Sequence, residues 1–452
     1  MLVILRRLRS YIVYLSKSLF IFVFAICLIT GCTNNEGVSI DVNELLVNVE
    51  SLKVEEIRIS DPATLEQVFP ESVFEVIALE YTPKSLLGDI DKVLYAENKY
   101  FVLDESSGIL YAFAKDGKYL FTVGSTGSGP DQYMKAKGFD LDADVGEIVV
   151  LDITEKIVHY NLTDGAYLKD YRLEDMPYAK LADIKLIGKD SIFLAKGKSS
   201  EILFPFDLMM VVNGKVESGG FPNTSPMDTI IGSYPSKWFS PSIVGEFAFI
   251  SPYIQEIHFM KGNKVSRSMQ LNMGKWMLSE QERVMLQEMS IPEKDEFISI
   301  NKKFSGFSKV IFNQDHLFFT SRGTGPVAYD FDTQRVVWFD NKYPAFGFAT
   351  IVGAFDDKII STINGEEFYK SNNMLLYNNW KPGLNNDKLF EAAYNHVSEL
   401  YPEWAKAVEL MKNSDNPLLI IGKINFGEPE YEPANFVPNW SNDFNIYVQK
   451  HK

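Results

Sequence analysis

A repeat of 48 residues is the feature that most constrains how this chain can fold. Val102-Leu103-Asp104 recurs in the same register as Val150-Leu151-Asp152, and Asp116-Gly117 recurs as Asp164-Gly165, each followed by a Tyr-Leu pair. Asp-Gly between apolar runs favours a tight hairpin turn, and the runs themselves are rich in residues that favour β-strands. Each unit is therefore predicted to be a meander of antiparallel strands.

Fainter copies extend the repeat beyond these two units. Asn213-Gly214 lies 49 residues after Asp164-Gly165, and Lys261-Gly262 follows 48 residues later. A four-stranded unit of this length cannot bury both of its faces alone, so neighbouring units must stack, and closure into a ring removes the exposed edges. We predict an all-β fold, a six-bladed β-propeller of four-stranded antiparallel blades with short helical insertions, over residues 69–452.

The insertions and the closure of the ring have their own signals. Ser279 followed three residues later by Glu282 is a capping box, which predicts a helix near 279–289, and a helical period predicts a second insertion near 387–413. The apolar run 418–422 is expected to close the ring against the strand predicted at 74–79.

Four motifs resemble a known family, the six-bladed β-propeller lipoproteins common in Bacteroidota, which are similar to NHL-repeat propellers. They are Leu86-Leu87-Gly88 before the first strand, Lys115–Leu120, Val123–Tyr133, and Asn416-Pro417 before the last strand. The resemblance implies the propeller architecture and a location in the cell envelope, and it carries no general catalytic motif. This chain departs from the pattern at Asp131-Gln132, where Gly-Glu is more usual.

The N-terminus has the pattern of an export signal that ends in a lipid anchor. Residues 1–31 contain four basic residues, then an uncharged apolar run that is shorter than a membrane span. Ile29-Thr30-Gly31-Cys32 resembles a bacterial lipobox, which predicts cleavage before Cys32 and acylation of its thiol. Residues 32–68 are then a polar tether. Because Thr33 is not acidic, we expect the outer membrane, on either its periplasmic or its surface side.

Cysteine usage and charge exclude several kinds of chemistry. The only other cysteine, Cys27, lies in the predicted signal, so the mature chain has no thiol for catalysis or for a zinc site. The net charge is −16, and it becomes −20 without the signal. A chain this acidic is repelled by phosphate backbones, so nucleic acid is not an expected partner. We expect no cofactor and no metal.

Three residues are the candidates for ligand binding. Trp238, between Pro235 and Pro241, and Tyr234, just before Pro235, lie in a stretch rich in turn residues, where they could form a stacking platform for a sugar or a peptide or simply pack over a blade edge. Arg322 stands beside the Gly-x-Gly-Pro turn at 323–326, which repeats the turn at 127–130. The turn is the same in both copies, but the residue before it is not. Deviation from a repeat marks positions that the fold does not need.

Other motifs have structural explanations. The glycine-rich loop 124–130 lacks the Lys-Ser/Thr of a phosphate-binding loop, and the alternating acids at 140, 142 and 144 lack the glycine and the final Glu of a calcium loop. Asp104 and Asp152 end equivalent strands and are expected to cap turns. The sequence therefore predicts a non-catalytic envelope lipoprotein that binds a glycan, peptide or protein, with an envelope hydrolase or lyase as the alternative.

Overall fold

The structure is a computed structural model, and its described part is one unit that begins after Asp41. The described residues are 51–52, 74–173, 181–197, 206–222, 237–243, 245–250, 256–270, 277–301, 303–304, 306–321, 324–333, 336–338, 351–363, 409–410, 414 and 416–423. Among them, no helix is long and apolar enough to cross a membrane.

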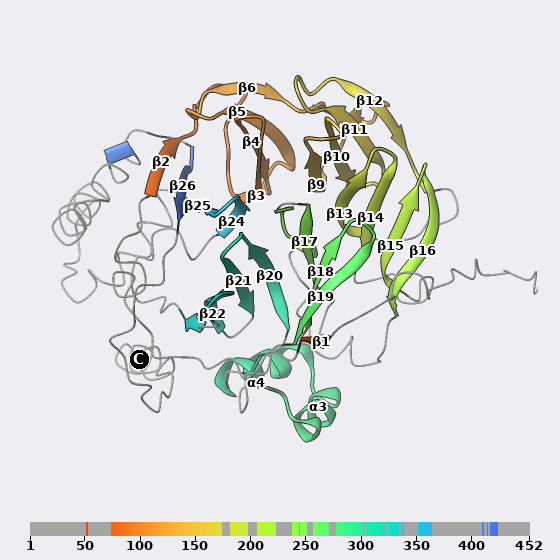
Figure 1. The fold of residues 1–452 in the computed structure, drawn as a ribbon, viewed down its shortest axis with the longest axis vertical. Coiled ribbons are helices and arrows are strands. Elements are labelled where there is room, and N and C mark those ends of the chain that lie inside the picture. The colour runs from red at the N-terminus through yellow and green to blue at the C-terminus, as the bar shows by residue number, and fades with distance from the viewer. Residues whose placement is uncertain are drawn as a thin grey trace, which may run out of the picture. The chain divides into compact units, whose positions relative to one another are not determined.

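Six four-stranded sheets are arranged as a six-bladed β-propeller, as the repeat predicted (Figure 1). Blades 1 to 3 consist of β3 (Ile90–Ala96), β4 (Lys99–Asp104), β5 (Ile109–Ala114) and β6 (Tyr119–Thr122); β9 (Ala136–Asp142), β10 (Glu147–Asp152), β11 (Ile157–Asn161) and β12 (Tyr167–Tyr171); and β13 (Leu181–Gly188), β14 (Ser191–Lys196), β15 (Phe206–Val212) and β16 (Lys215–Pro222). Blades 4 to 6 consist of β17 (Glu246–Ile250), β18 (Glu256–Lys261), β19 (Lys264–Gln270) and β1 (Ser51–Leu52); β20 (Phe307–Phe312), β21 (His316–Ser321), β22 (Thr324–Asp330) and β23 (Val336–Trp338); and β24 (Ile351–Phe355), β25 (Lys358–Ile363), β26 (Leu418–Lys423) and β2 (Phe74–Ala78).

The repeated glycines form the turns between the third and fourth strands of the blades. Gly117 joins β5 to β6 with φ at 87°, and Gly165 joins β11 to β12 with φ at 70°. Gly214 takes the same left-handed conformation between β15 and β16. Side chains with a Cβ rarely adopt this conformation, so the turn fixes glycine at each repeat.

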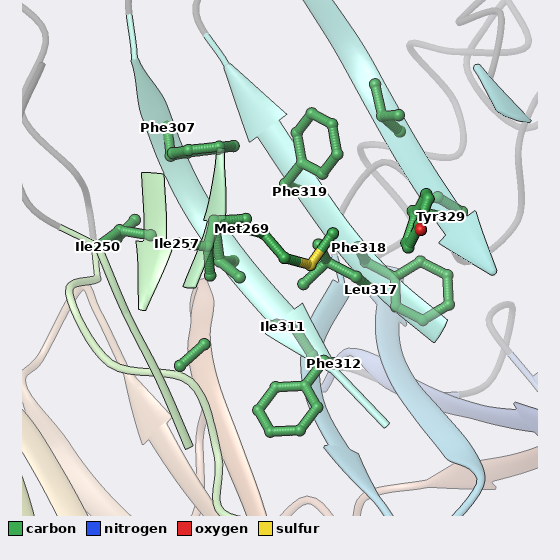
Figure 2. Close-up of a cluster of buried hydrophobic side chains, with 14 of the residues drawn as sticks. Ile250, Ile257, Met269, Phe307, Ile311, Phe312, Leu317, Phe318, Phe319 and Tyr329 are labelled. Atoms are coloured by element: carbon green, nitrogen blue, oxygen red, sulfur yellow. The ribbon is translucent and has the colours of Figure 1, made fainter. Parts of the chain in front are cut away.

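The core lies between neighbouring blades. Every residue of β10 is buried, because both faces of the blade are covered. Between blades 4 and 5, Ile257 and Met269 belong to the same apolar cluster as Ile311 and Phe312 (Figure 2). This two-sided burial explains why the strands read as continuous apolar runs rather than as alternating patterns.

The ring closes where the sequence predicted it. β26 pairs antiparallel with β2, with Phe74 opposite Gly422, so β2 and the last described strand share blade 6. Asn416, just before β26, reinforces the closure: its Oδ1 accepts from Leu87 N at 2.9 Å, and its Nδ2 donates to Ser85 O at 2.7 Å.

Blade 4 departs from the regular pattern at both edges. On its inner edge, segment 238–243 lies beside β17 through bridges that pair Phe239 with Phe249 and Ile243 with Glu246. On its outer edge, β1 pairs in parallel with β19. Ser51–Leu52 had been predicted as part of a polar tether, but the free edge of β19 supplies hydrogen-bonding groups that hold these residues as a strand.

The predicted capping box is present. Ser279 caps α3 (Glu280–Gln287), accepting from Glu282 N at 3.3 Å while Glu282 accepts from Ser279 N at 2.8 Å. A second helix, α4 (Ile291–Asn301), follows directly. The insertion predicted near 387–413 lies outside the described residues, apart from 409–410.

Candidate functional site at the propeller axis

The first strands of five blades share an irregularity near their beginnings. In each, the pairing with the second strand skips one residue; the skipped residues are Asp91, Lys137, Ala182, Ser308 and Val352. Such a bulge redirects the neighbouring side chains. These first strands are the inner strands of the blades. The end of the blades where they begin is called the entry end.

The residues that directly follow the bulge are equivalent in position but not in kind. They are Lys92, Gly138, Asp183, Lys309 and Gly353 in blades 1, 2, 3, 5 and 6. The two glycines permit close packing. A Cβ at Gly138 would lie 2.7 Å from Asp183 Oδ1, and a Cβ at Gly353 would lie 2.1 Å from Val93 O. The three charged residues belong to one network around the propeller axis, the axial cluster, whose members are Asp91, Lys92, Asp140, Asp183, Lys185, Lys237 and Lys309.

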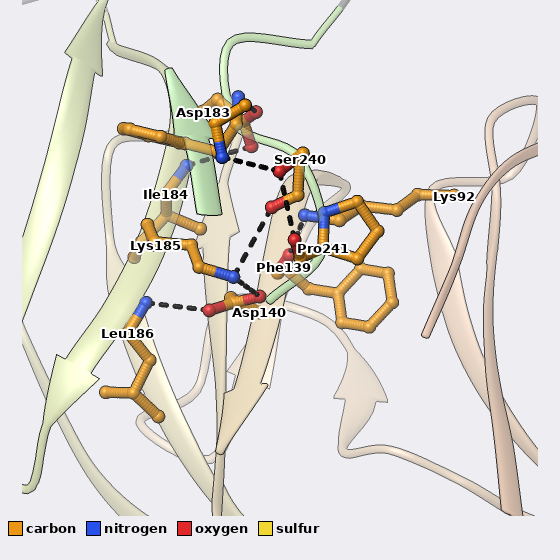
Figure 3. A network of polar contacts seen from close by, with 11 residues as sticks. Lys92, Phe139, Asp140, Asp183, Ile184, Lys185, Leu186, Ser240 and Pro241 are labelled. Carbon is orange, nitrogen blue, oxygen red and sulfur yellow. Dashed lines mark hydrogen bonds and ion pairs between the residues drawn. The ribbon is translucent and has the colours of Figure 1, made fainter. Parts of the chain in front are cut away.

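A deep ion pair ties blades 2 and 3 together. Lys185 Nζ lies 3.0 Å from Asp140 Oδ1, and both side chains are only 1% exposed (Figure 3). Asp140 Oδ2 also accepts from Leu186 N at 2.9 Å, and Lys185 donates to Ser240 O at 3.4 Å. Burial lowers the pKa of Lys185, and the Asp140 carboxylate opposes this effect.

Asp183 anchors the inner segment of blade 4. Its Oδ2 accepts from Trp238 N at 3.0 Å and from Phe239 N at 3.1 Å, while its Oδ1 accepts from Ile184 N at 2.9 Å. Three backbone donors therefore compensate a carboxylate that is fully buried. The Pro-containing segment 238–243 is held by this contact rather than by a regular ladder.

A second ion pair lies closer to solvent, at the entry end. Lys237 Nζ lies 2.5 Å from Asp91 Oδ2 and donates to Lys137 O at 2.9 Å, so it connects the segment before blade 4 with blades 1 and 2. Lys309 of blade 5 reaches the same place and donates to Asp91 O at 3.3 Å. Burial by itself would lower the pKa of Lys237, but the carboxylates of Asp91 and Asp183 outweigh it and raise this pKa.

Two lysines of the axial cluster are left without a carboxylate partner among the described residues. Lys92 is 3% exposed; its Nζ donates to Phe139 O at 2.8 Å and lies 5.4 Å from the centre of the Phe139 ring. Lys309 is half-buried, and burial lowers its pKa. Among the described residues the cluster holds four lysines and three aspartates, and the exposed Glu105 lies close enough to raise the pKa of Lys237 and of Lys309.

The structure places Trp238 in the core and not on a binding surface. The side chain is 2% exposed and belongs to the apolar cluster between blades 3 and 4, with its ring 6.2 Å from that of Phe249. The expectation of an exposed stacking platform is therefore not met at Trp238, and the packing alternative describes it. Tyr234 and Arg322 lie outside the described residues.

The two repeated aspartates cap turns, as expected. Asp104 accepts from Gly88 N and from the backbone and hydroxyl groups of Ser106 and Ser107. Asp152 accepts from Met134 N and Lys135 N, both at 2.9 Å. Their role at the ends of β4 and β10 is structural.

The glycine-rich loop presents its carbonyl groups, not its N–H groups, to a buried charge. Lys156 Nζ donates to Gly129 O at 2.7 Å, to Pro130 O at 3.3 Å and to Gln132 O. Carbonyl oxygens attract a cation and repel phosphate, so this loop is a turn held by Lys156.

The alternating acids are likewise accounted for. Asp140 pairs with Lys185, and Asp142 Oδ1 accepts from Asp144 N at 2.9 Å and from Val145 N at 3.2 Å. Over the described ranges, no group of three or more metal-ligating side chains comes together.

Three histidines are buried away from the inner strands. His159 in β11 pairs with Glu147 at 2.8 Å, His258 in β18 with Ser268 at 2.8 Å, and His316 in β21 with Asp330 at 3.4 Å. Burial lowers the pKa of each, that of His258 to about 4. These histidines are neutral near pH 7 and belong to the packing of their own blades.

A family model described as a domain of unknown function, DUF4934, matches residues 49–423. The chain belongs to the DUF4934 family. This match covers the six blades, including β1 and the closing strand β26. None of the curated proteins matches the chain.

Two solved structures are similar to this chain at low sequence identity. A protein of Bacteroides fragilis that is inferred to be exported is 16% identical, with a TM-score of 0.58; the similarity covers 84% of this chain and 100% of that one. A DUF4221 family member of Bacteroides vulgatus is 11% identical over 79% of this chain and 99% of that one, with a TM-score of 0.43. At this identity, the first of these comparisons supports the fold alone.

Proposed function

We propose that this DUF4934 protein is a lipid-anchored protein of the cell envelope whose propeller binds a glycan, peptide or protein at its entry end, without catalysis. The observation that carries the proposal is the axial cluster. Five blades keep the same bulge, yet the residues that follow it change from lysine to aspartate to glycine. The fold needs the bulge and the buried Asp183, while the half-buried Lys309 is available for recognition.

The location rests on the sequence of the leader. The lipobox at Cys32 supports a lipid anchor, the non-acidic Thr33 after it favours the outer membrane, and the fold neighbour from Bacteroides fragilis that is inferred to be exported is consistent with an envelope location. Replacing Cys32 with Ser should release the protein from the membrane fraction into the soluble fraction. If Cys32→Ser remains in the membrane fraction, the lipid anchor is wrong.

Arg322 is retained as a binding candidate because of the strands that flank it. Ser321, the last residue of β21, pairs with Phe307 at the start of β20 and with Thr324 at the start of β22. These residues lie at the entry end of blade 5, where Lys309 joins the axial cluster. An arginine in this connection would offer a fork of donors to a carboxylate or a sugar hydroxyl.

The binding function can be tested with a matched pair of charge removals. Lys118 lies in the turn between β5 and β6, at the opposite end of the blades, and its side chain is 74% exposed. Arg322→Ala should weaken retention of a partner found on a glycan array or by pull-down, whereas Lys118→Ala should not. Equal retention by both variants would exclude the entry end as the binding face. Both variants should melt within a degree or two of the wild type.

A further inference from the structure

The two lysines without carboxylate partners point to the chemistry of the ligand. Removing an ammonium group from water costs several kcal/mol unless a charge or good hydrogen bonds compensate it. In the axial cluster, Asp140 compensates Lys185 and Asp91 compensates Lys237, while Asp183 is held by backbone donors. Among the described residues no carboxylate lies within ion-pair distance of Lys92 or Lys309, although those of Asp91 and Glu105 are close enough to raise the pKa of Lys309.

The two lysines also belong to the same place. Lys309 Nζ donates to Asp91 O, and Asp91 is the residue before Lys92 in β3. The charges of Lys237 and Lys92 lower the pKa of Lys309, whereas those of Asp91 and Glu105 raise it. Lys309 is half-buried, whereas Lys92 is almost fully buried and its ammonium is directed toward blade 2 (Figure 3).

We propose that the entry end of the axis binds the anionic group of a small organic ligand, contacted by Lys309 and stabilised from below by the charge of Lys92. This rests on the proposed binding function and names its ligand class. We take the ligand to be organic rather than a bare ion, because the segments that lead into β3 and β9 at the entry end carry the exposed apolar side chains Leu86 and Met134. The exposed Glu105 near Lys309 disfavours multiply charged polyanions.

A carboxylate and a phosphate monoester would both satisfy this site, and two matched ligand pairs separate them. Galacturonate is compared with galactose, and glucose 6-phosphate with glucose, by calorimetric titration of the mature chain. A charge-assisted hydrogen bond is worth about tenfold or more in Kd, so the anionic member of at least one pair should bind about tenfold tighter than its neutral partner. A preference in only one pair identifies the anionic group. Equal affinity within both pairs, or binding of neither anion, would overturn the inference.

Variants test the residues. Lys309→Gln should weaken binding of the anion about tenfold, and Lys309→Arg should retain it. Lys84→Gln is the control, because Lys84 is an exposed lysine in the segment before β3 and its removal changes the net charge equally. If Lys309→Gln and Lys84→Gln have the same affinity as the wild type, Lys309 is not the contact and the inference is wrong.

Lys92→Met distinguishes a ligand-directed charge from a structural one. If the ammonium serves the ligand, its removal should leave the melting temperature unchanged or higher while weakening binding of the anion. A melting temperature several degrees lower with unchanged affinity would assign Lys92 to the fold and refute its part in the site. These outcomes test only the binding of anions. If no anion binds but a partner is still retained and Arg322→Ala weakens its retention, the inference is wrong and the proposed binding function is still supported.

Discussion

Asn416 provides a sharp test of how the ring is closed. It is 4% exposed and precedes β26, and its amide joins this last strand to the segment between β2 and β3. Besides the contacts with Leu87 N and Ser85 O, its Nδ2 donates to Glu80 O at 3.1 Å. Asn416→Ala would remove all three contacts and leave the N–H of Leu87 without this acceptor.

The size of the effect follows from these contacts. Three hydrogen bonds at a net value of about 1 kcal/mol each predict a loss of about 3 kcal/mol in the free energy of unfolding. For the 375 residues of the matched domain, an unfolding entropy of about 0.8 kcal/mol per kelvin converts this into a fall of about 4 °C in Tm. The contacts lie between chain segments more than 300 residues apart, so the loss should appear as weaker ring closure rather than as local fraying.

Urea unfolding and calorimetry of Asn416→Ala would measure this loss. Asn301→Ala is the matched control: Asn301 is exposed, and among the described residues its amide donates to Phe297 O within α4, so the change should stay within about 0.5 kcal/mol. Asn416→Asp should be worse than Asn416→Ala at neutral pH, because the introduced carboxylate faces carbonyl oxygens, and it should recover as the pH falls and the carboxyl regains a donor. An effect of Asn416→Ala no larger than the control would refute the closure argument.

Three further predictions concern the described core. Lys185→Met should cost about 3–5 kcal/mol by leaving Asp140 buried and unpaired, and adding Asp140→Leu should recover part of that loss in a double-mutant cycle by urea unfolding; strict additivity would contradict the pairing. Because the pKa of His258 is lowered to about 4 from 6.5, its contribution to stability is complete above pH 6.5 and is lost as the pH falls toward 4, by up to about 3 kcal/mol; His258→Gln should flatten this part of the pH profile, and an unchanged slope would count against it. Chelation should leave Tm unchanged, since the carboxylates of Asp140 and Asp142 are already occupied by Lys185 and by backbone N–H groups; a fall of many degrees would reveal a metal site.

The fold was readable from the sequence because its repeated residues have strict backbone or capping roles. Gly117 and Gly165 occupy left-handed turns, and Asp104 and Asp152 hold the segments that lead into the inner strands. These requirements recur in successive blades, so they appear as a period in the sequence. The parallel pairing of β1 with β19 carried no such signal, because a two-residue edge strand depends on backbone groups alone.

The site was harder to read because its residues look ordinary in sequence. Lys92, Lys185 and Lys309 each interrupt an apolar strand, a pattern that usually marks a solvent-facing position. In a blade covered on both faces, however, a lysine of the inner strand is directed to the axis instead. Trp238 failed as a candidate for a related reason: segment 238–243 contains Pro241 and lacks strand alternation, so its place at the inner edge of blade 4 was hidden.

The arrangement of charge at the axis separates what the propeller needs from what it can change. Asp183 and the Asp140–Lys185 pair hold blades 2, 3 and 4 together, so their loss would cost the fold as well as any binding. Among the described residues, Lys309 hydrogen-bonds to the backbone carbonyl of Asp91 and is only half-buried. Substitution at this position can therefore alter the ligand while the bulge, the capping aspartates and the closure at Asn416 stay intact. Relatives of the same architecture are accordingly expected to differ in ligand chemistry at the residue equivalent to Lys309 before they differ in the residues that hold the blades.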